Sequence, residues 1–319
     1  MTPKQRLALV QKEIARSKTR LKALHTERVA SRTLPPRRQV ISPLLRVAAL
    51  APQTFKLVAQ GDSWFDYPTS WDLIDWLVNA HGHDVDNLGV AGSTLNDIVY
   101  GPVPENWLGI PQSDDTSRSA ELISRIGEKH PDAVLLSGGG NDIAGDEFFS
   151  FVNNALSSLA NPNQQVLDGV VKETFEKAYS DLIELIGAKA QAMGYKLPVF
   201  LHGYDYPWPD GRGFSMFNLV GPWFHPTFNK KNYPYDEEDD NAPAELAIRR
   251  RIVGQFIDSF NLMLAGLEAK YAGTVHYVDL RGTLKSHDEW ANELHPKREG
   301  FGKLADRINL ALHAVLPPA

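Results

Sequence analysis

The chain has 319 residues, 43% of them hydrophobic and 23% charged, which suits one large globular domain with appended segments. It contains no cysteine, so disulfides and thiolate metal sites are excluded. No apolar stretch is long enough to span a bilayer, and no basic segment followed by an apolar one marks a secretory leader. The sequence therefore predicts a cytoplasmic protein.

The first 50 residues differ from the rest in charge. They hold 12 Lys and Arg against 2 Asp and Glu, a net charge of +10, whereas the remaining 269 residues hold 21 against 37, a net charge of −16. Residues 1–50 are therefore predicted to form a basic arm and linker, and residues 51–319 a separate domain. Apolar residues spaced three or four positions apart, with one interruption, predict an amphipathic helix in the arm. These residues are Leu7, Val10, Ile14, Leu21 and Leu24.

Three roles are open for this arm. It could pack on its own domain or a neighbour as an ordinary solvated helix, because the outer face of an exposed helix is normally charged. It could instead join copies of the chain into a homo-oligomer through a short coiled-coil seam. Few aromatic residues interleave with the Lys and Arg, so we do not expect a nucleic acid or a membrane surface to be the partner.

From residue 55 onward, short apolar runs alternate with helical patterns. Each run is enriched in Val, Ile, Leu, Phe or Tyr, as strands are. The predicted strands are 55–60, 84–88, 133–137, 198–202 and 275–279, and the predicted helices are about 70–80, 93–99, 119–129, 166–193, 245–271 and 300–314. Regular alternation with crossovers of this length predicts an α/β fold with a parallel five-stranded sheet that helices cover on both faces.

The first predicted strand ends in Gly61-Asp62-Ser63-Trp64, which places a hydroxyl where a strand gives way to a turn. In open α/β sheets the C-terminal ends of the strands border the crevice in which ligands bind. Backbone N–H groups of such a turn are free to face an anionic intermediate. Small polar residues after a strand are more often a plain turn, so this motif alone is a weak signal of catalysis.

Three further motifs complement Ser63. Gly92 lies in a turn after the second strand, Asn141 in a Gly-rich turn after the third, and His295 in the loop before the last helix. Acyl transfer requires a nucleophile, a base within hydrogen-bond reach, and donors aimed at the oxyanion. Together the motifs predict Ser63 as nucleophile and His295 as base. The predicted oxyanion donors are the N–H of Ser63, the N–H of Gly92 and the side-chain amide of Asn141.

These four motifs resemble the SGNH hydrolases, also called the GDSL esterase/lipase family, across roughly residues 55–312. The letters of that name correspond, in the expected order, to Ser63, Gly92, Asn141 and His295. The resemblance implies a flavodoxin-like, three-layer α/β/α domain. It also implies a serine hydrolase that cleaves carboxylic esters, thioesters or O-acetyl groups of small molecules, with no metal and no cofactor.

The chain departs from the family pattern at one position. The family carries Asp three residues before the histidine, whereas this chain has Asn292. An amide oxygen can accept the imidazole Nδ1–H and hold the ring, but it cannot stabilise an imidazolium with a full charge. Asn292 is the favoured third member of the triad. A carboxylate could take this role instead, and the candidates are Asp288, Glu293 and Asp205, the last at the end of the fourth strand. The remaining arrangement is a Ser–His dyad.

Residues 203–243 form an insertion that a minimal domain does not need. The segment is dense in aromatic residues interleaved with Pro and Gly. A loop of this length in a compact domain is usually functional or disordered, and the aromatic density argues against disorder. We interpret it as a cap that shapes the substrate pocket; the alternative is a structural insertion whose rings pack on the domain surface.

Two other functions compete with the hydrolase. The missing Asp and the appended basic helix would suit a non-catalytic binding or scaffold protein that keeps the fold. The Gly-Asp and Gly-Asn-Asp motifs with scattered His residues loosely suggest a metallophosphoesterase, which needs several His and Asp ligands around paired ions. The metallophosphoesterase is the weaker alternative, because no Asp-x-His follows the first strand and the third-strand motif ends in Asp rather than His.

Overall fold

The computed structural model describes residues 53–104, 115–214, 221–236 and 242–317. The predicted N-terminal arm lies outside these residues, so its helix and its role in an oligomer stay predictions. Within the described ranges, no helix is both long enough and apolar enough to cross a membrane.

Five parallel strands form one sheet in the order β2-β1-β3-β4-β5, which is the order of a flavodoxin-like, doubly wound sheet. The strands are β1 (Lys56–Gln60), β2 (Asp84–Asn87), β3 (Ala133–Leu136), β4 (Val199–His202) and β5 (Val275–Val278). Each observed strand begins and ends within one residue of its predicted range. The predicted α/β fold with a parallel five-stranded sheet is confirmed.

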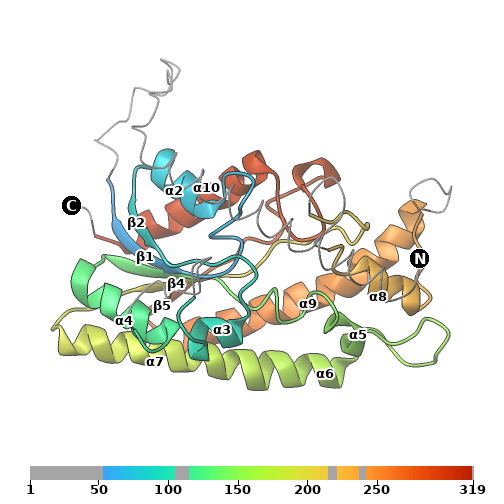
Figure 1. Cartoon of the computed structure of the whole chain (residues 1–319), viewed down its shortest axis with the longest axis horizontal. Helices are drawn as coiled ribbons and strands as arrows, with labels where there is room; N and C mark the ends of the chain where they lie inside the picture. Colours follow the sequence, from blue (N-terminus) through green and yellow to red (C-terminus); the bar gives the residue numbers. More distant parts are fainter. Residues whose placement is uncertain (1–52, 105–114, 215–220, 237–241, 318–319) are drawn as a thin grey trace, which may run out of the picture.

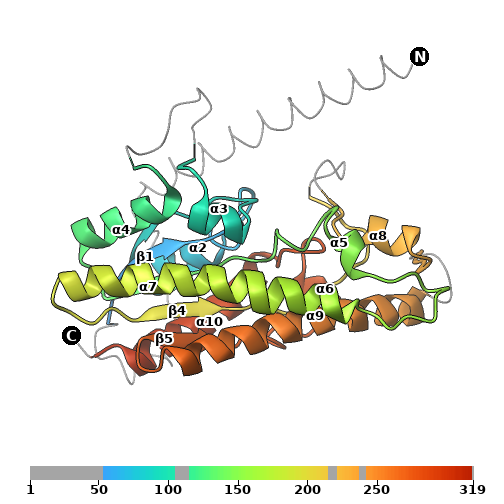
Figure 2. The same ribbon diagram turned by 90° about the horizontal axis from the view of Figure 1, so that it is seen from below.

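Helices cover both faces of the sheet and make three layers (Figures 1 and 2). On one face α2 packs against α10, and on the other α4, α7 and α9 lie side by side, with α3 against α4 and α7. Their bounds are α2 (Leu73–Asn79), α3 (Leu95–Tyr100), α4 (Arg118–Lys129), α7 (Glu176–Ala192), α9 (Ala242–Lys270) and α10 (Arg298–Val315). The three-layer α/β/α arrangement is therefore confirmed as well.

Several features of the helices were not visible in the sequence pattern. The predicted helix 166–193 begins as α6 (Gln164–Asp168) and reaches α7 through a π-helical segment, Gly169–Phe175. Two short helices, α5 (Phe148–Phe151) and α8 (His225–Lys230), were not predicted. Helix α5 has only four residues, and the six residues of α8 include a single large apolar side chain, Phe228, so neither helix shows an apolar period.

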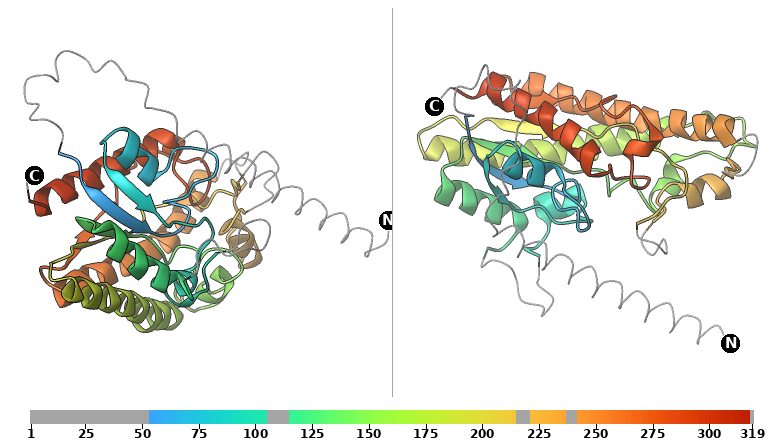
Figure 3. Two further views of the ribbon diagram at one scale, coloured as in Figure 1. Left: turned by 60° about the vertical axis from the view of Figure 1, so that its left-hand side comes forward. Right: turned by 90° about the horizontal axis from the view of Figure 1, so that it is seen from above.

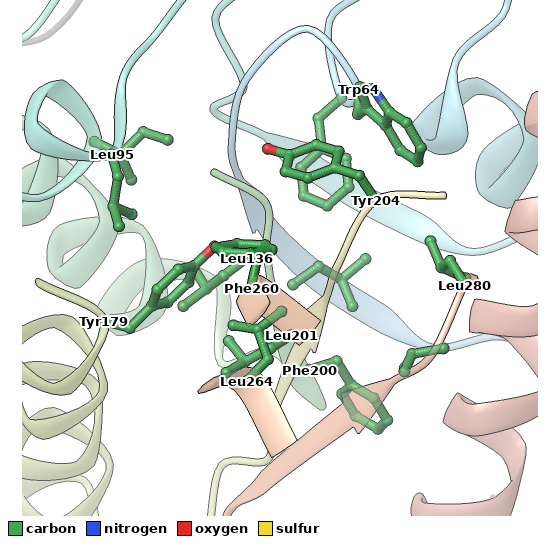
Figure 4. Packing of buried hydrophobic residues seen from close by; sticks show 14 of the residues in the cluster. Trp64, Leu95, Leu136, Tyr179, Phe200, Leu201, Tyr204, Phe260, Leu264 and Leu280 are labelled. Atoms are coloured by element: carbon green, nitrogen blue, oxygen red, sulfur yellow. The ribbon is translucent and has the colours of Figure 1, made fainter. Parts of the chain in front are cut away.

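The core lies between the sheet and the helices of each face. Figure 4 shows Phe260 and Leu264 of α9 against Leu136 of β3 and Leu201 of β4. All four side chains are buried, as expected for central strands of a sheet that helices cover on both faces. Helix α9 is long enough to continue beyond the sheet, toward the part of the chain that carries α8 (Figure 3). It therefore links the core to the insertion.

Candidate active site

The turn after β1 holds Ser63 through the carboxylate of its neighbour Asp62. One Asp62 oxygen accepts the Trp64 N–H at 3.0 Å and the Ser137 hydroxyl at 3.1 Å, and the other accepts the Tyr204 hydroxyl. The Tyr204 hydroxyl in turn accepts the Gly140 N–H at 3.1 Å. Buried Asp62 thus connects the turn that carries Ser63 with the ends of β3 and β4. An Asp side chain that accepts the backbone N–H two residues further on stabilises a turn of this kind.

The structure brings His295 against Ser63, although 232 positions separate them. The Ser63 Oγ and the His295 Nε2 lie 2.7 Å apart. The imidazole stacks on the Tyr67 ring, with centroids 4.5 Å apart, and meets the edge of Trp223 at 5.7 Å. Burial lowers the pKa of His295 to about 3. The ring is therefore neutral at physiological pH and able to accept a proton.

Asn292 occupies the position on the far side of the imidazole. Its Oδ1 lies 3.0 Å from His295 Nδ1 and also accepts the N–H groups of Leu294 and His295, both at 2.9 Å. Its Nδ2 donates to the Tyr67 hydroxyl at 3.3 Å. Because an amide oxygen only accepts, the proton of the neutral ring belongs on Nδ1, which leaves Nε2 to accept from Ser63.

The three alternative carboxylates are engaged or directed elsewhere. Glu293 is fully buried and accepts the backbone N–H groups of Gly211, Trp223, Phe224 and His225. Asp205 accepts those of Tyr206, Gly282 and Leu284. Asp288 is exposed on a short 3-10 turn, His287–Glu289. The side chain that meets His295 Nδ1 is therefore the amide of Asn292 and none of these carboxylates.

Asn141 and Gly92 lie on neighbouring loops after β3 and β2. The Asn141 Nδ2 donates one hydrogen to the Ser93 carbonyl at 2.9 Å, and an amide NH₂ has a second hydrogen to offer. Gly92 is exposed, with a φ of 82°, a backbone conformation in which glycine has no steric cost. Asn141 borders the same cavity as Ser63 and His295, whereas Gly92 is not among the residues that line it.

Asp142 and Arg118 hold these loops together; of the two, only Arg118 had no sequence signal for this role. Asp142 accepts the Leu95 N–H at 2.7 Å, at the start of α3, and burial raises its pKa to about 6. Arg118, at the start of α4, is buried and donates to the Ser93 hydroxyl at 2.6 Å and to the Leu88 carbonyl at 3.3 Å. A single Arg at a helix start carries no sequence signal for such a role.

A cavity of about 70 Å³ opens beside Ser63 and His295. Its walls are mostly apolar and come from the Gly-rich loop that carries Asn141, from the insertion and from one face of α9. The insertion contributes Pro207 and Phe224, and Trp223 contacts His295. The described parts of the insertion therefore help to shape the pocket, as a cap would.

The described side chains are poorly arranged to bind a metal ion. Among the described residues, no group of three or more His, Cys, Asp or Glu side chains could hold one. The buried carboxylates of the site instead accept N–H and O–H donors of the protein itself.

Comparison with known proteins gives a family and several solved structures. A family model described as GDSL-like lipase/acylhydrolase matches residues 57–308, and no curated protein matches the chain. An extracellular lipase from Streptomyces rimosus is 13% identical, with a TM-score of 0.48, covering 82% of this chain and 99% of that one. A family 3 carbohydrate esterase from Clostridium thermocellum is 14% identical, with a TM-score of 0.38, covering 82% and 100%.

A third structure, described as a GDSL-like lipase from Bacteroides ovatus, is 12% identical, with a TM-score of 0.45. The match covers 83% of this chain but spans only 54% of the Bacteroides chain.

Proposed function

This chain belongs to the GDSL-like lipase/acylhydrolase family and is an esterase/lipase-type hydrolase, and we propose that it cleaves ester bonds through a Ser–His acyl-enzyme mechanism. The observation that carries the proposal is the 2.7 Å contact between Ser63 Oγ and His295 Nε2, with Asn292 Oδ1 at 3.0 Å from His295 Nδ1. A nucleophile, a base and an orienting group in line form the arrangement that serine hydrolases require.

In the first half of the reaction, Ser63 Oγ attacks the ester carbonyl while His295 Nε2 removes its proton. The carbonyl oxygen becomes an oxyanion, which accepts hydrogen bonds from the N–H of Ser63, the N–H of Gly92 and the Nδ2 of Asn141. The imidazolium then gives its proton to the leaving alcohol oxygen as the carbon–oxygen bond breaks. The products of this half are the free alcohol and an acyl group esterified to Ser63.

In the second half, water replaces the alcohol. His295 Nε2 takes a proton from the water as the water oxygen attacks the acyl carbonyl, and the same donors hold the new oxyanion. The proton returns to Ser63 Oγ when the tetrahedral intermediate collapses, which releases the carboxylic acid. Small esters, thioesters and O-acetyl groups can all pass through these steps.

Asn292 also favours a second candidate function, a binding protein that retains the fold. An imidazolium must form transiently at His295, in a site where burial already lowers the pKa of this residue to about 3. A neutral amide gives that cation less stabilisation than a carboxylate would. We therefore expect a slow hydrolase, and a chain without any turnover would be a binding protein.

A covalent probe distinguishes the hydrolase from the binding protein. Wild-type protein and Ser63→Ala are treated with a broad fluorophosphonate, their intact masses are measured, and hydrolysis of short p-nitrophenyl esters is followed in the same samples. A single adduct that is absent from Ser63→Ala, together with ester turnover, supports the hydrolase. Folded wild-type protein with neither adduct nor turnover would favour the binding protein.

A further inference from the structure

The face of α9 that borders the catalytic cavity consists of four apolar side chains at helical spacing. Val253, Phe256, Ile257 and Phe260 occupy positions i, i+3, i+4 and i+7, so they project from one side of the helix. Ser63, its base His295 and the Gly-rich turn that carries Asn141 line the same cavity. The reacting atoms thus share one cavity with this apolar face of α9, which we call its floor.

Building on the proposed function, we propose that this cavity binds the acyl part of the substrate and that α9 limits the acyl chain to about six carbons. The acyl group stays attached to Ser63 through both halves of the reaction. The alcohol, in contrast, must leave and water must enter before deacylation. An apolar recess beside Ser63 therefore suits the group that remains bound, and the exposed side near Gly92 suits the group that is exchanged.

The size of the cavity sets the chain length. The volume is about 70 Å³. One water molecule needs roughly 10–15 Å³ of such space, so the cavity takes on the order of five chain atoms beyond the carbonyl carbon. Each methylene that it buries strengthens binding by roughly three- to fourfold, and a longer chain finds no further room without displacing packed side chains.

Ile257 is the floor residue that can change without disturbing the catalytic loops. Phe260 packs beside Gly139, where an added Cβ would lie 2.9 Å from the ring, and stacks on Tyr204, so its loss would loosen the oxyanion turn. Phe256 packs between rings of α5, with Phe148 at 5.4 Å between centroids. Ile257 is only partly buried and contributes a branched chain to the cavity wall.

The same helix offers a matched control. Leu262 is 72% exposed, and it does not line the cavity. Ile257→Ala removes three carbons from the floor and extends the preferred acyl chain by about three carbons. Ile257→Phe fills the floor and shifts preference toward acetyl. Leu262→Ala leaves the preference unchanged.

The test uses alkylphosphonate p-nitrophenyl esters with methyl, butyl and octyl chains, because these label the serine whether or not turnover is fast. Labelling rates are measured by intact mass for wild type, both Ile257 variants and Leu262→Ala. In parallel, kcat/KM is measured for p-nitrophenyl esters of two to ten carbons, and for acetate esters of alcohols of increasing length.

The expected result is an octyl-to-methyl labelling ratio that rises at least about tenfold in Ile257→Ala, with no change in alcohol preference. If Ser63 were labelled but the Ile257 variants did not change the octyl-to-methyl ratio, the proposed acyl site would be wrong, while the proposed hydrolase activity would still hold. A shift in alcohol preference instead would assign the cavity to the leaving group. If no probe labelled Ser63, both the proposed hydrolase activity and the proposed acyl site would be wrong.

Discussion

At the scale of single residues, Asn292 is the feature that distinguishes this site. Its Oδ1 accepts three hydrogen bonds at 2.9–3.0 Å and holds the imidazole in the tautomer that can act as a base. What it lacks is charge. A neutral partner positions His295 as well as a carboxylate would, but it would not stabilise the imidazolium that the proposed mechanism forms when Ser63 loses its proton.

Replacing Asn292 with Asp should therefore raise activity. We expect kcat/KM at pH 7 to increase at least about tenfold, since the carboxylate stabilises the imidazolium and the Tyr67 hydroxyl can turn to donate to it. The pKa of His295, held at about 3 by burial, should rise. Because only the neutral ring accepts a proton, the acidic limb of the rate profile should move from near pH 3 to higher pH.

The measurement is the pH dependence of kcat/KM between pH 3 and 9 for both proteins. Asn309→Asp is a matched control, because Asn309 Oδ1 meets His83 Nε2 at 2.9 Å and no group of the site. Asn309→Asp should leave the pH dependence of kcat/KM unchanged. If Asn292→Asp changed neither the rate nor the position of the acidic limb, Asn292 would have no part in orienting the base.

At the scale of elements, the carboxylate of Glu293 ties the insertion after β4 to the loop that carries Asn292 and His295. Both Glu293 oxygens accept backbone N–H groups, those of Gly211 and His225 on one and those of Trp223 and Phe224 on the other. Burial nevertheless raises the pKa of Glu293 to about 7. The neighbour of Asn292 thus supports the cap instead of completing the triad.

Glu293→Gln should detach part of the cap. One oxygen becomes an NH₂ group that faces two N–H donors, so those bonds are lost and buried donors are left without acceptors. We expect a loss of about 2–4 kcal/mol in the free energy of unfolding. Faster cleavage of the insertion by a protease at low concentration should accompany it. Urea unfolding and timed proteolysis measure these two effects.

Glu289→Gln is the control from the same loop. Glu289 lies nearer the surface, where it pairs with Lys303 at 2.6 Å and accepts the Ser286 N–H at 2.8 Å, so its replacement should cost less than that of fully buried Glu293. Equal stability of Glu293→Gln and wild type would mean that the cap is held by its aromatic packing and its other hydrogen bonds, such as that from Arg212 to the Trp290 carbonyl, and not by the Glu293 carboxylate.

At the scale of the whole molecule, the parallel sheet gathers motifs that are far apart in sequence. Ser63 follows β1 and Asn141 follows β3, the two strands between which the direction of chain winding reverses. A crevice forms at such a switch point because adjacent loops diverge to opposite faces. The stability of the sheet and its helical layers therefore underlies the geometry of the site.

Leu201→Ala tests this dependence. Leu201 is completely buried in β4 under α9, and its truncation should lower the free energy of unfolding by about 2–5 kcal/mol, as core leucines do. Leu310, which is 68% exposed on α10, provides the control, with an expected change within about 0.5 kcal/mol. Urea unfolding of both variants gives these values, and a Leu201→Ala protein as stable as wild type would contradict the assigned core.

Much of the fold could be predicted because its signals are local. Runs of five or six residues that contain Val, Ile, Leu, Phe or Tyr predicted all five strands, although β2, with the sequence DVDN, is mostly polar. The long helices followed from their apolar period. The short helices α5 and α8 were missed, because α5 has only four residues and α8 has a single large apolar side chain, so neither shows that period. The cytoplasmic location and the division at residue 50 stay predictions.

By itself, the sequence determined the alternation of strands and helices and the chemical groups available for catalysis, because both depend on residue types and spacings along the chain. Only the tertiary structure decided which amide or carboxylate meets the imidazole, which side chains tie the loops together, and how deep the pocket is. Asn292, Glu293 and Asp205 are all polar candidates in a sequence. Their roles become distinct only in the folded chain, where the distances between segments far apart in the sequence determine which acceptor meets each donor.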